Sequence, residues 1–163
     1  MKLLLNFLII FFPGISEAQN RIEGKYNDYF GYTVEINIDS TFDFNWRFDL
    51  FAYWCTGKWT IINDTIYFDK IPVYDTLLIV NKNGQPDDSL ILSNDKKPGL
   101  ITTSEMAINS ISSGGQDLLK FPGKLFYRNN RLYQIWNGKV VKKKVRGFWT
   151  NKKYPPWFVK ESR

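Results

Sequence analysis

The chain has 163 residues, of which 17% are aromatic and 23% are charged, a composition too apolar for a disordered segment and a length suited to one domain. It contains no histidine and a single cysteine, which excludes histidine-based nucleophilic triads, His-ligated metal sites and an intrachain disulfide framework. The sequence therefore predicts no catalytic residue, no metal site and no cofactor.

The first 18 residues have the three parts of an export signal. A positive Met-Lys start precedes the apolar run 3–12, and Ser16-Glu17-Ala18 supplies the small residues of a cleavage site. The apolar run is about half of the ~20 residues that a spanning helix needs. We expect cleavage before Gln19, leaving 19–163 as a single β domain that is periplasmic or extracellular. The residue after the cut is not cysteine, so the sequence predicts no lipid anchor. No second apolar run long enough to span a membrane follows, so it predicts no transmembrane span either.

Apolar and polar residues alternate by twos at the start of the mature chain. Over 32–38 the residues Tyr32, Val34, Ile36 and Ile38 share one face. After a polar turn at 39–41 the alternation resumes over 42–50, and the apolar face carries Phe42, Phe44, Trp46, Phe48 and Leu50. The two runs predict an antiparallel hairpin whose aromatic face anchors the core.

Short strand-like runs separated by turn residues continue to residue 145. They are 58–62, 65–68, 76–80, 89–92, 100–103, 124–128, 131–136 and 139–145. Asn137-Gly138 is the strongest hairpin signal, because both residues accept the positive φ of a type I′ turn. About nine or ten short strands predict an all-β fold, an antiparallel up-and-down barrel with a β-sandwich as the alternative.

Two further segments complete the assignment before the C-terminal third. Residues 104–111 have a weak helix pattern with Ser104 as the N-cap, and 109–117, which contains two serines and two glycines, reads as a flexible loop.

Three short motifs resemble the opening of small lipocalin-like barrels of bacterial envelopes, including the N-terminal barrel of copper-resistance and envelope-stress lipoproteins. The motifs are Gly24-Lys25-Tyr26, the strand-turn-strand 34–42, and Gly57-Lys58-Trp59 followed by 63–66. The resemblance is confined to residues 22–68 and implies a lipocalin-like barrel fold. Those lipoproteins carry a Cys-x-x-Cys pair and a lipidated cysteine that this chain lacks, so their copper or redox role is not implied here.

Charge is distributed unevenly along the mature chain. Residues 19–119 contain 8 Lys or Arg against 14 Asp or Glu, whereas 120–163 contain 13 Lys or Arg and one Glu. Cations interleaved with aromatic residues are typical of surfaces that bind polyanions. The candidate contact residues are Lys142, Lys144, Arg146, Trp149, Lys152 and Lys153, with 142–144 on a strand. The alternative is that this basic block pairs with the acidic strands of the first hairpin and otherwise supplies solubility, since a run of charges is usually a solvated face.

Three functions follow as hypotheses. The first is an exported, non-catalytic binding module for a small apolar ligand held inside the barrel. The second is an interaction protein that contacts an acidic glycan or anionic lipid through its basic face, nucleic acid being excluded because exported proteins meet little of it. The third is an enzyme that uses buried carboxylates. Cys55 is expected to be a small buried residue, since no histidine is available to generate its thiolate.

Overall fold

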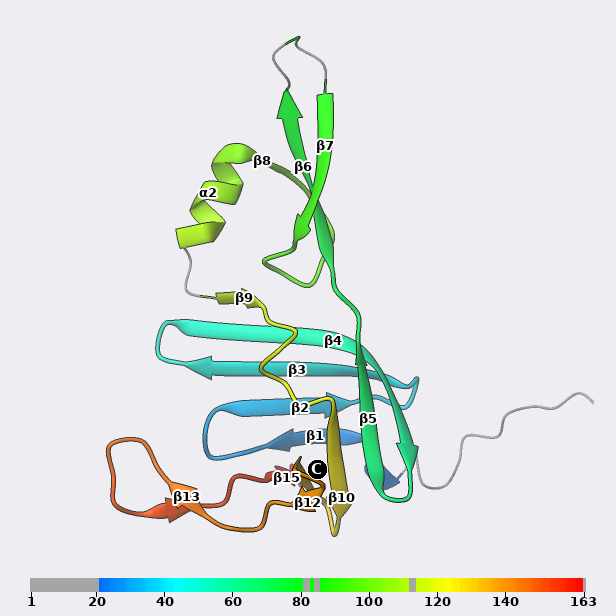
Figure 1. Cartoon of the computed structure of the whole chain (residues 1–163), viewed down its shortest axis with the longest axis vertical. Coiled ribbons are helices and arrows are strands. Elements are labelled where there is room, and N and C mark those ends of the chain that lie inside the picture. The colour runs from blue at the N-terminus through cyan, green and yellow to red at the C-terminus, as the bar shows by residue number, and fades with distance from the viewer. Residues whose placement is uncertain (1–20, 81–82, 84–85, 112–113, 163) are drawn as a thin grey trace, which may run out of the picture.

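The computed structural model describes residues 21–162 except 81–82, 84–85 and 112–113. The predicted signal segment lies outside the described residues. Eight antiparallel strands close into a barrel in the order β1-β2-β3-β4-β5-β10-β11-β15, with β15 pairing back to β1. The barrel prediction is therefore confirmed (Figure 1). The barrel strands are β1 (Gly24–Asn27), β2 (Tyr32–Ile36), β3 (Thr41–Phe48), β4 (Phe51–Ile62), β5 (Thr65–Lys70), β10 (Lys124–Arg128), β11 (Arg131–Trp136) and β15 (Phe158–Lys160).

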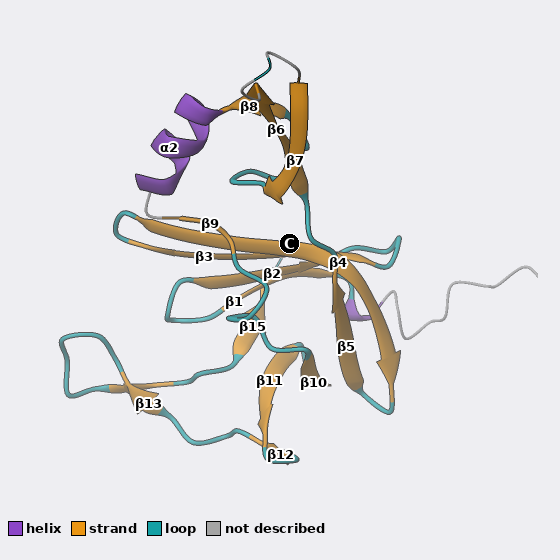
Figure 2. Ribbon diagram, turned by 45° about the horizontal axis from the view of Figure 1, so that its top comes forward, coloured by secondary structure: helices purple, strands orange, loops and turns teal. Residues whose placement is uncertain are grey.

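Two insertions interrupt the barrel. The first, called the lobe, comprises β6 (Tyr74–Val80), β7 (Pro86–Leu92), β8 (Leu100–Thr102), α2 (Thr103–Ile111) and β9 (Gly114–Gln116). The second contains β12 (Lys139–Val140), β13 (Val145–Arg146) and β14 (Lys153–Tyr154). Neighbouring barrel strands alternate in direction, so both insertions leave the barrel at the end that carries the β1–β2 and β3–β4 turns. Figure 2 shows the lobe and the β13 hairpin extending from the barrel in different directions.

The number of strands exceeds the prediction. Among the described residues there are fifteen, and the ones that sequence patterning missed are β1, β9, β14 and β15. Each of these has two to four residues, too few to establish an alternating pattern. Prediction also merged β12 and β13 into one strand, whereas residues 141–144 between them are not in a strand.

The region from 104 to 117 is more ordered than predicted. Helix α2 begins at Thr103, and Thr102, not Ser104, is its N-cap. The Thr102 hydroxyl accepts the N–H of Glu105 at 3.3 Å, and the Glu105 carboxylate accepts the N–H of Thr102 at 2.7 Å, which is a capping box. Residues 114–116, predicted as loop, form β9, which pairs in parallel with Ala52 to Trp54 of β4.

The inward faces of the barrel strands form one aromatic core. Val34 lies opposite Phe44, and Phe44 lies opposite Cys55, so the predicted inward face of the first hairpin is correct at its centre. Trp46 is only half-buried, and Ile38 and Leu50, which were predicted on the same face, are exposed because they lie in turns beyond the ends of β2 and β3. The core consists of Ile22, Tyr26, Val34, Ile36, Phe42, Phe44, Cys55, Trp59, Ile66, Phe68, Phe121, Leu125, Tyr127, Leu132 and Phe158.

Phe121 fills the interior although it belongs to no strand. Its ring lies 4.4 Å from that of Phe44 and 4.8 Å from that of Phe68, and the side chain has no exposed surface. The Lys70 ammonium donates to the carbonyl oxygens of Leu118 and Phe121 and thereby fixes the loop that delivers the ring. The four rings of Phe42, Phe44, Phe68 and Phe121 thus pack against one another inside the barrel.

Candidate binding surface

The predicted contact residues lie on one projecting element, which we call the basic arm and define as residues 141–154. Within it β13 and β14 form a short antiparallel hairpin, with Val145 opposite Tyr154 and Arg146 opposite Lys153. Lys142 and Lys144 lie in the segment that leads into the hairpin, and Lys152 and Lys153 lie on its return side. All four lysines are exposed. Residues 142–144 are not in a strand, so the prediction that places these lysines on a strand is wrong.

The turn of the basic arm is built around Arg146 and Trp149. The N–H of Gly147 donates to the carbonyl of Lys152 at 3.0 Å and closes the turn. The Arg146 guanidinium donates to the carbonyl of Thr150 at 3.1 Å and to the side chain of Asn151. Arg146 therefore orders the turn as well as contributing charge. Trp149 occupies the turn with φ 50° and a side chain that is 90% exposed.

Aromatic contacts hold the basic arm against the barrel. The Phe148 ring lies 5.5 Å from Phe30 of the β1–β2 turn and 4.6 Å from Phe48 at the end of β3. Tyr154 stacks on Tyr29. We call Tyr29, Phe30 and Phe48 the aromatic rim. Sequence analysis did not associate the arm with this rim, because the contacts join residues about 100 positions apart.

Asp28 organises the turn that carries Tyr29 and Phe30, two of the three residues of the aromatic rim. Its carboxylate accepts the backbone N–H groups of Phe30 at 2.8 Å and Tyr32 at 2.9 Å. Burial raises the pKa of Asp28 to about 6, and these two hydrogen bonds only partly offset that effect. The turn thus contains a carboxyl whose charged form is disfavoured in the folded protein.

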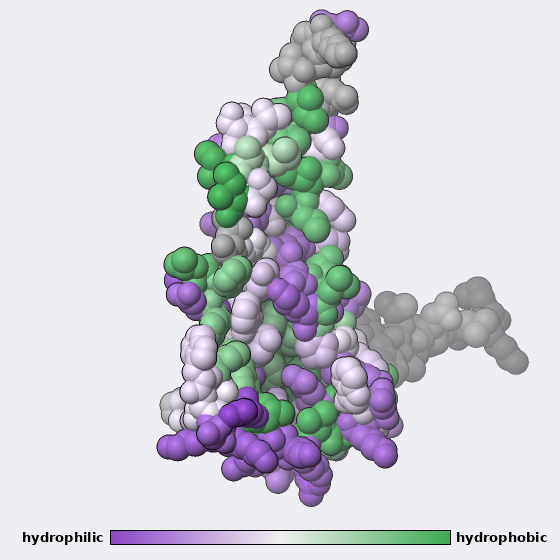
Figure 3. Space-filling view, turned by 60° about the vertical axis from the view of Figure 1, so that its left-hand side comes forward, coloured by the Kyte–Doolittle hydropathy of each residue, from purple (hydrophilic) through white to green (hydrophobic). Residues whose placement is uncertain are grey.

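The cations of the basic arm have no acidic partner within the part of the chain that the structure describes. Between Asp117 and Glu161 the sequence has no Asp or Glu at all. The acidic residue Asp43 of the first hairpin pairs with Lys96 of the lobe at 2.6 Å. The pairing between the arm and the first hairpin is therefore not found among the described residues, whereas the exposure of the arm lysines also fits a solvated face that supplies solubility. Viewed from the side that carries the arm, hydrophilic residues cover the lower part of the molecule (Figure 3). The arm therefore presents unpaired positive charge.

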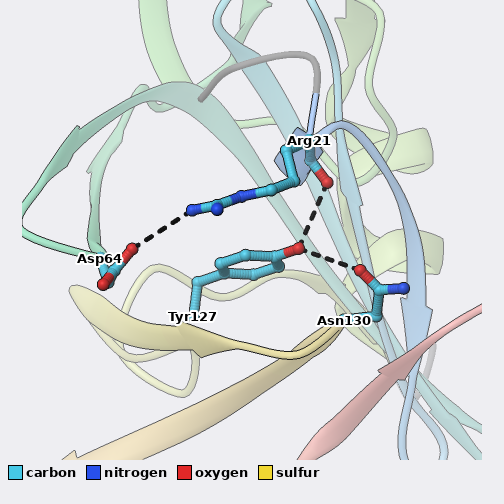
Figure 4. Close-up of polar contacts among 4 residues, drawn as sticks. All are labelled: Arg21, Asp64, Tyr127 and Asn130. Atoms are coloured by element: carbon cyan, nitrogen blue, oxygen red, sulfur yellow. Dashed lines mark hydrogen bonds and ion pairs between the residues drawn. The ribbon is translucent and has the colours of Figure 1, made fainter. Parts of the chain in front are cut away.

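A hollow of about 390 Å³ lies at the opposite end of the barrel and was not predicted from sequence. The Arg21 guanidinium lies 3.4 Å from Asp64 and covers the ring of Tyr127, whose hydroxyl is 3.0 Å from the side-chain oxygen of Asn130 (Figure 4). These groups thus interact with one another through an ion pair, a cation–π contact and a hydrogen bond. The arrangement joins the start of the domain to the β4–β5 and β10–β11 turns, and we assign it a structural role.

A smaller hollow of about 200 Å³ lies between α2 and the sheet of the lobe. Ile91, Ile101 and Met106 line it together with Asp75 and Ser93. Ligand pockets usually measure about 300 to 1,000 Å³, so this space is small for a ligand site.

Among the described residues, one acidic side chain and the single cysteine are buried. Asp75, the one acidic residue there with a buried side chain, accepts the N–H of Gly99 at 2.9 Å. Cys55 is buried in the core, and burial raises the pKa of its thiol to about 12. At neutral pH this thiol is protonated and unreactive.

No protein-family model, curated protein or solved structure matches the chain. None of the described helices is long and apolar enough to cross a membrane.

Proposed function

We propose that the protein is an exported, non-catalytic binding module that attaches to an anionic surface through its basic arm. The observation that carries this proposal is the arm's set of exposed, unpaired cations around an exposed tryptophan. Buried or paired charges have structural explanations, but these charges have no partner within the described chain. An acidic envelope component supplies the missing negative charge.

The filled interior leads us to favour this surface over the barrel for binding. Phe42, Phe44, Phe68 and Phe121 pack against one another inside the barrel with at most 7% of any side chain exposed. A small apolar ligand there would have to displace one of these rings. The hypothesis of an apolar ligand is thus less well supported than the hypothesis of an external anionic partner.

We also propose that the protein is related to the lipocalin-like envelope barrels. The closed antiparallel barrel and the motifs within 22–68 support it. The apolar run at the N-terminus supports export.

Chromatography on an anionic matrix tests the proposed function. The variant Lys142→Ser, Lys144→Ser, Lys152→Ser, Lys153→Ser removes four arm cations. We expect it to elute at a clearly lower salt concentration than the wild type, because exposed charges act through a screened attraction.

A control of equal charge is available elsewhere on the barrel and the lobe. Lys25, Lys58, Lys97 and Lys124 are also exposed, and the four Ser substitutions there change net charge by the same amount. Elution of both fourfold variants at the same salt would show that only total charge matters and would overturn the role of the arm.

A further inference from the structure

Exposed apolar side chains surround the tip of the basic arm. Trp149 is 90% exposed, and its ring lies 5.4 Å from that of Phe48, the last residue before the β3–β4 turn. That turn carries Leu50, which is 81% exposed, followed by Phe51, which is 46% exposed. Phe48 and Phe51 are cross-strand partners, so the arm tip and the β3–β4 turn are joined through Phe48. We call Trp149, Leu50 and Phe51 the apolar tip.

The backbone at Trp149 points to a role outside the fold. A positive φ is unfavourable for a bulky side chain, and turns that need this conformation normally use Gly, Asn or Asp. At Trp149 the conformation leaves the indole ring in solvent, where it contributes little to the core. Strain that persists at an exposed aromatic residue is a signature of functional positions.

The chemistry of the tip separates two kinds of anionic partner. A soluble acidic glycan needs cations and hydrogen-bond donors, and it gains nothing from an exposed leucine. The interface of a bilayer accepts Trp, Leu and Phe among the lipid headgroups, while surrounding lysines attract anionic lipids. Along the basic arm, exposed lysines lie on both sides of Trp149 in the sequence, Lys142 and Lys144 before it and Lys152 and Lys153 after it.

We infer that the apolar tip and the arm lysines form one surface that binds anionic lipid bilayers, with Trp149 inserted at the headgroup level. This inference rests on the proposed function and names its partner. Binding combines two contributions: electrostatic attraction brings the arm to the membrane, and insertion of the tip retains it there.

Vesicle co-sedimentation tests the inference on the mature chain. The probes are vesicles of phosphatidylcholine with phosphatidylglycerol, and vesicles of phosphatidylcholine alone. We expect binding to the anionic vesicles only. Trp149→Asn should weaken that binding about tenfold while leaving the elution salt on an anionic matrix unchanged.

Folding of the variant is controlled in two ways. Asn tolerates positive φ, so the thermal midpoint of Trp149→Asn should stay within about 3 °C of the wild type. Leu50→Ser is an independent variant that should also weaken vesicle binding. Trp136, which is 73% exposed at the β11–β12 turn, gives the matched control, and Trp136→Ser should bind vesicles as the wild type does.

The outcomes separate the inference from the proposed function. Salt-dependent retention on the anionic matrix without vesicle binding would overturn the lipid partner and leave the arm as a site for acidic glycans. Vesicle binding that is unchanged in both Trp149→Asn and Leu50→Ser would overturn insertion of the tip. Failure to bind either the matrix or the vesicles would overturn the proposed function itself.

Discussion

The barrel buries its large apolar residues in one core, whereas its two insertions leave many of theirs exposed. The core cluster comes from the barrel strands, the Ile22 turn and the loop that carries Phe121. In the lobe α2 has no buried residue, and Leu90, Leu100 and Ile111 are each more than two-thirds exposed. Stability therefore resides in the barrel. The insertions are surface segments on this scaffold, and such segments commonly carry recognition.

Specific polar contacts attach the lobe to the barrel in place of a shared core. The Lys96 ammonium of the lobe pairs with the Asp43 carboxylate of β3 at 2.6 Å. The indole N–H of Trp54 in β4 donates to the carbonyl of Asn94 at 3.0 Å. Such contacts fix position, but each contributes only about 1 kcal/mol to stability. Three substitutions test this division of roles.

The largest effect is expected from Phe121→Ala, which removes the ring at the centre of the barrel. Large-to-small changes of buried Phe cost about 3 to 5 kcal/mol, because they lose burial and leave a cavity. Urea denaturation measures the loss. Leu119→Ala, two residues earlier at a side chain that is 92% exposed, is the control and should change stability by less than about 0.5 kcal/mol. A small loss for Phe121→Ala would mean that the interior is not tightly filled, and it would revive a ligand in the barrel.

An intermediate effect, a gain in stability at neutral pH and not a loss, is expected from Asp28→Asn. The folded pKa of Asp28, about 6, lies above the ordinary value of 3.8, so the wild type loses stability as pH rises from about 4 to about 6. Taken in full, this pKa difference corresponds to a loss of about 3 kcal/mol in the free energy of unfolding. Screening by solvent at this partly exposed carboxyl reduces the expected loss to about 1 kcal/mol. Asn keeps an oxygen that accepts both backbone N–H groups without the charge.

Urea denaturation at pH 4 and pH 7 measures this effect. Asp28→Asn should be more stable than the wild type at pH 7, and the two proteins should converge at pH 4. A variant that is less stable than the wild type at pH 7 would show that the charge strengthens the turn beneath the basic arm.

The smallest effect is expected in the lobe. Ile108 of α2 is 67% exposed, so Ile108→Ala should change the free energy of unfolding by less than about 0.5 kcal/mol, helped by the high helix propensity of Ala. Thermal denaturation provides the measurement. A loss above about 2 kcal/mol would mean that α2 is covered in solution, and the contrast between barrel and lobe would then fail.

Local sequence determined the parts of the fold that need only neighbouring residues. Alternation from Tyr32 to Phe48 is long enough to specify the first hairpin and to place Phe44 inside. The turns at Asn63-Asp64, Asn129-Asn130 and Asn137-Gly138 all have the positive φ values that their residue types favour. The concentration of cations after residue 120 likewise identified the basic arm as a candidate surface, because charge composition requires no knowledge of the fold.

Tertiary structure decided how the barrel closes, which residues fill its interior, and the shape of the candidate binding surface. The barrel closes through β1 and β15, where Tyr26 pairs with Lys160 across 134 positions, and strands of three or four residues carry too little pattern to predict that pairing. Phe121 enters the core from a loop, which periodicity cannot reveal. The contacts of Phe148 and Trp149 with Phe48 likewise depend on long-range packing. Sequence patterning indicates on which face of its own strand a residue lies. Closure of the barrel and docking of the basic arm depend instead on which distant strand or turn packs against that face.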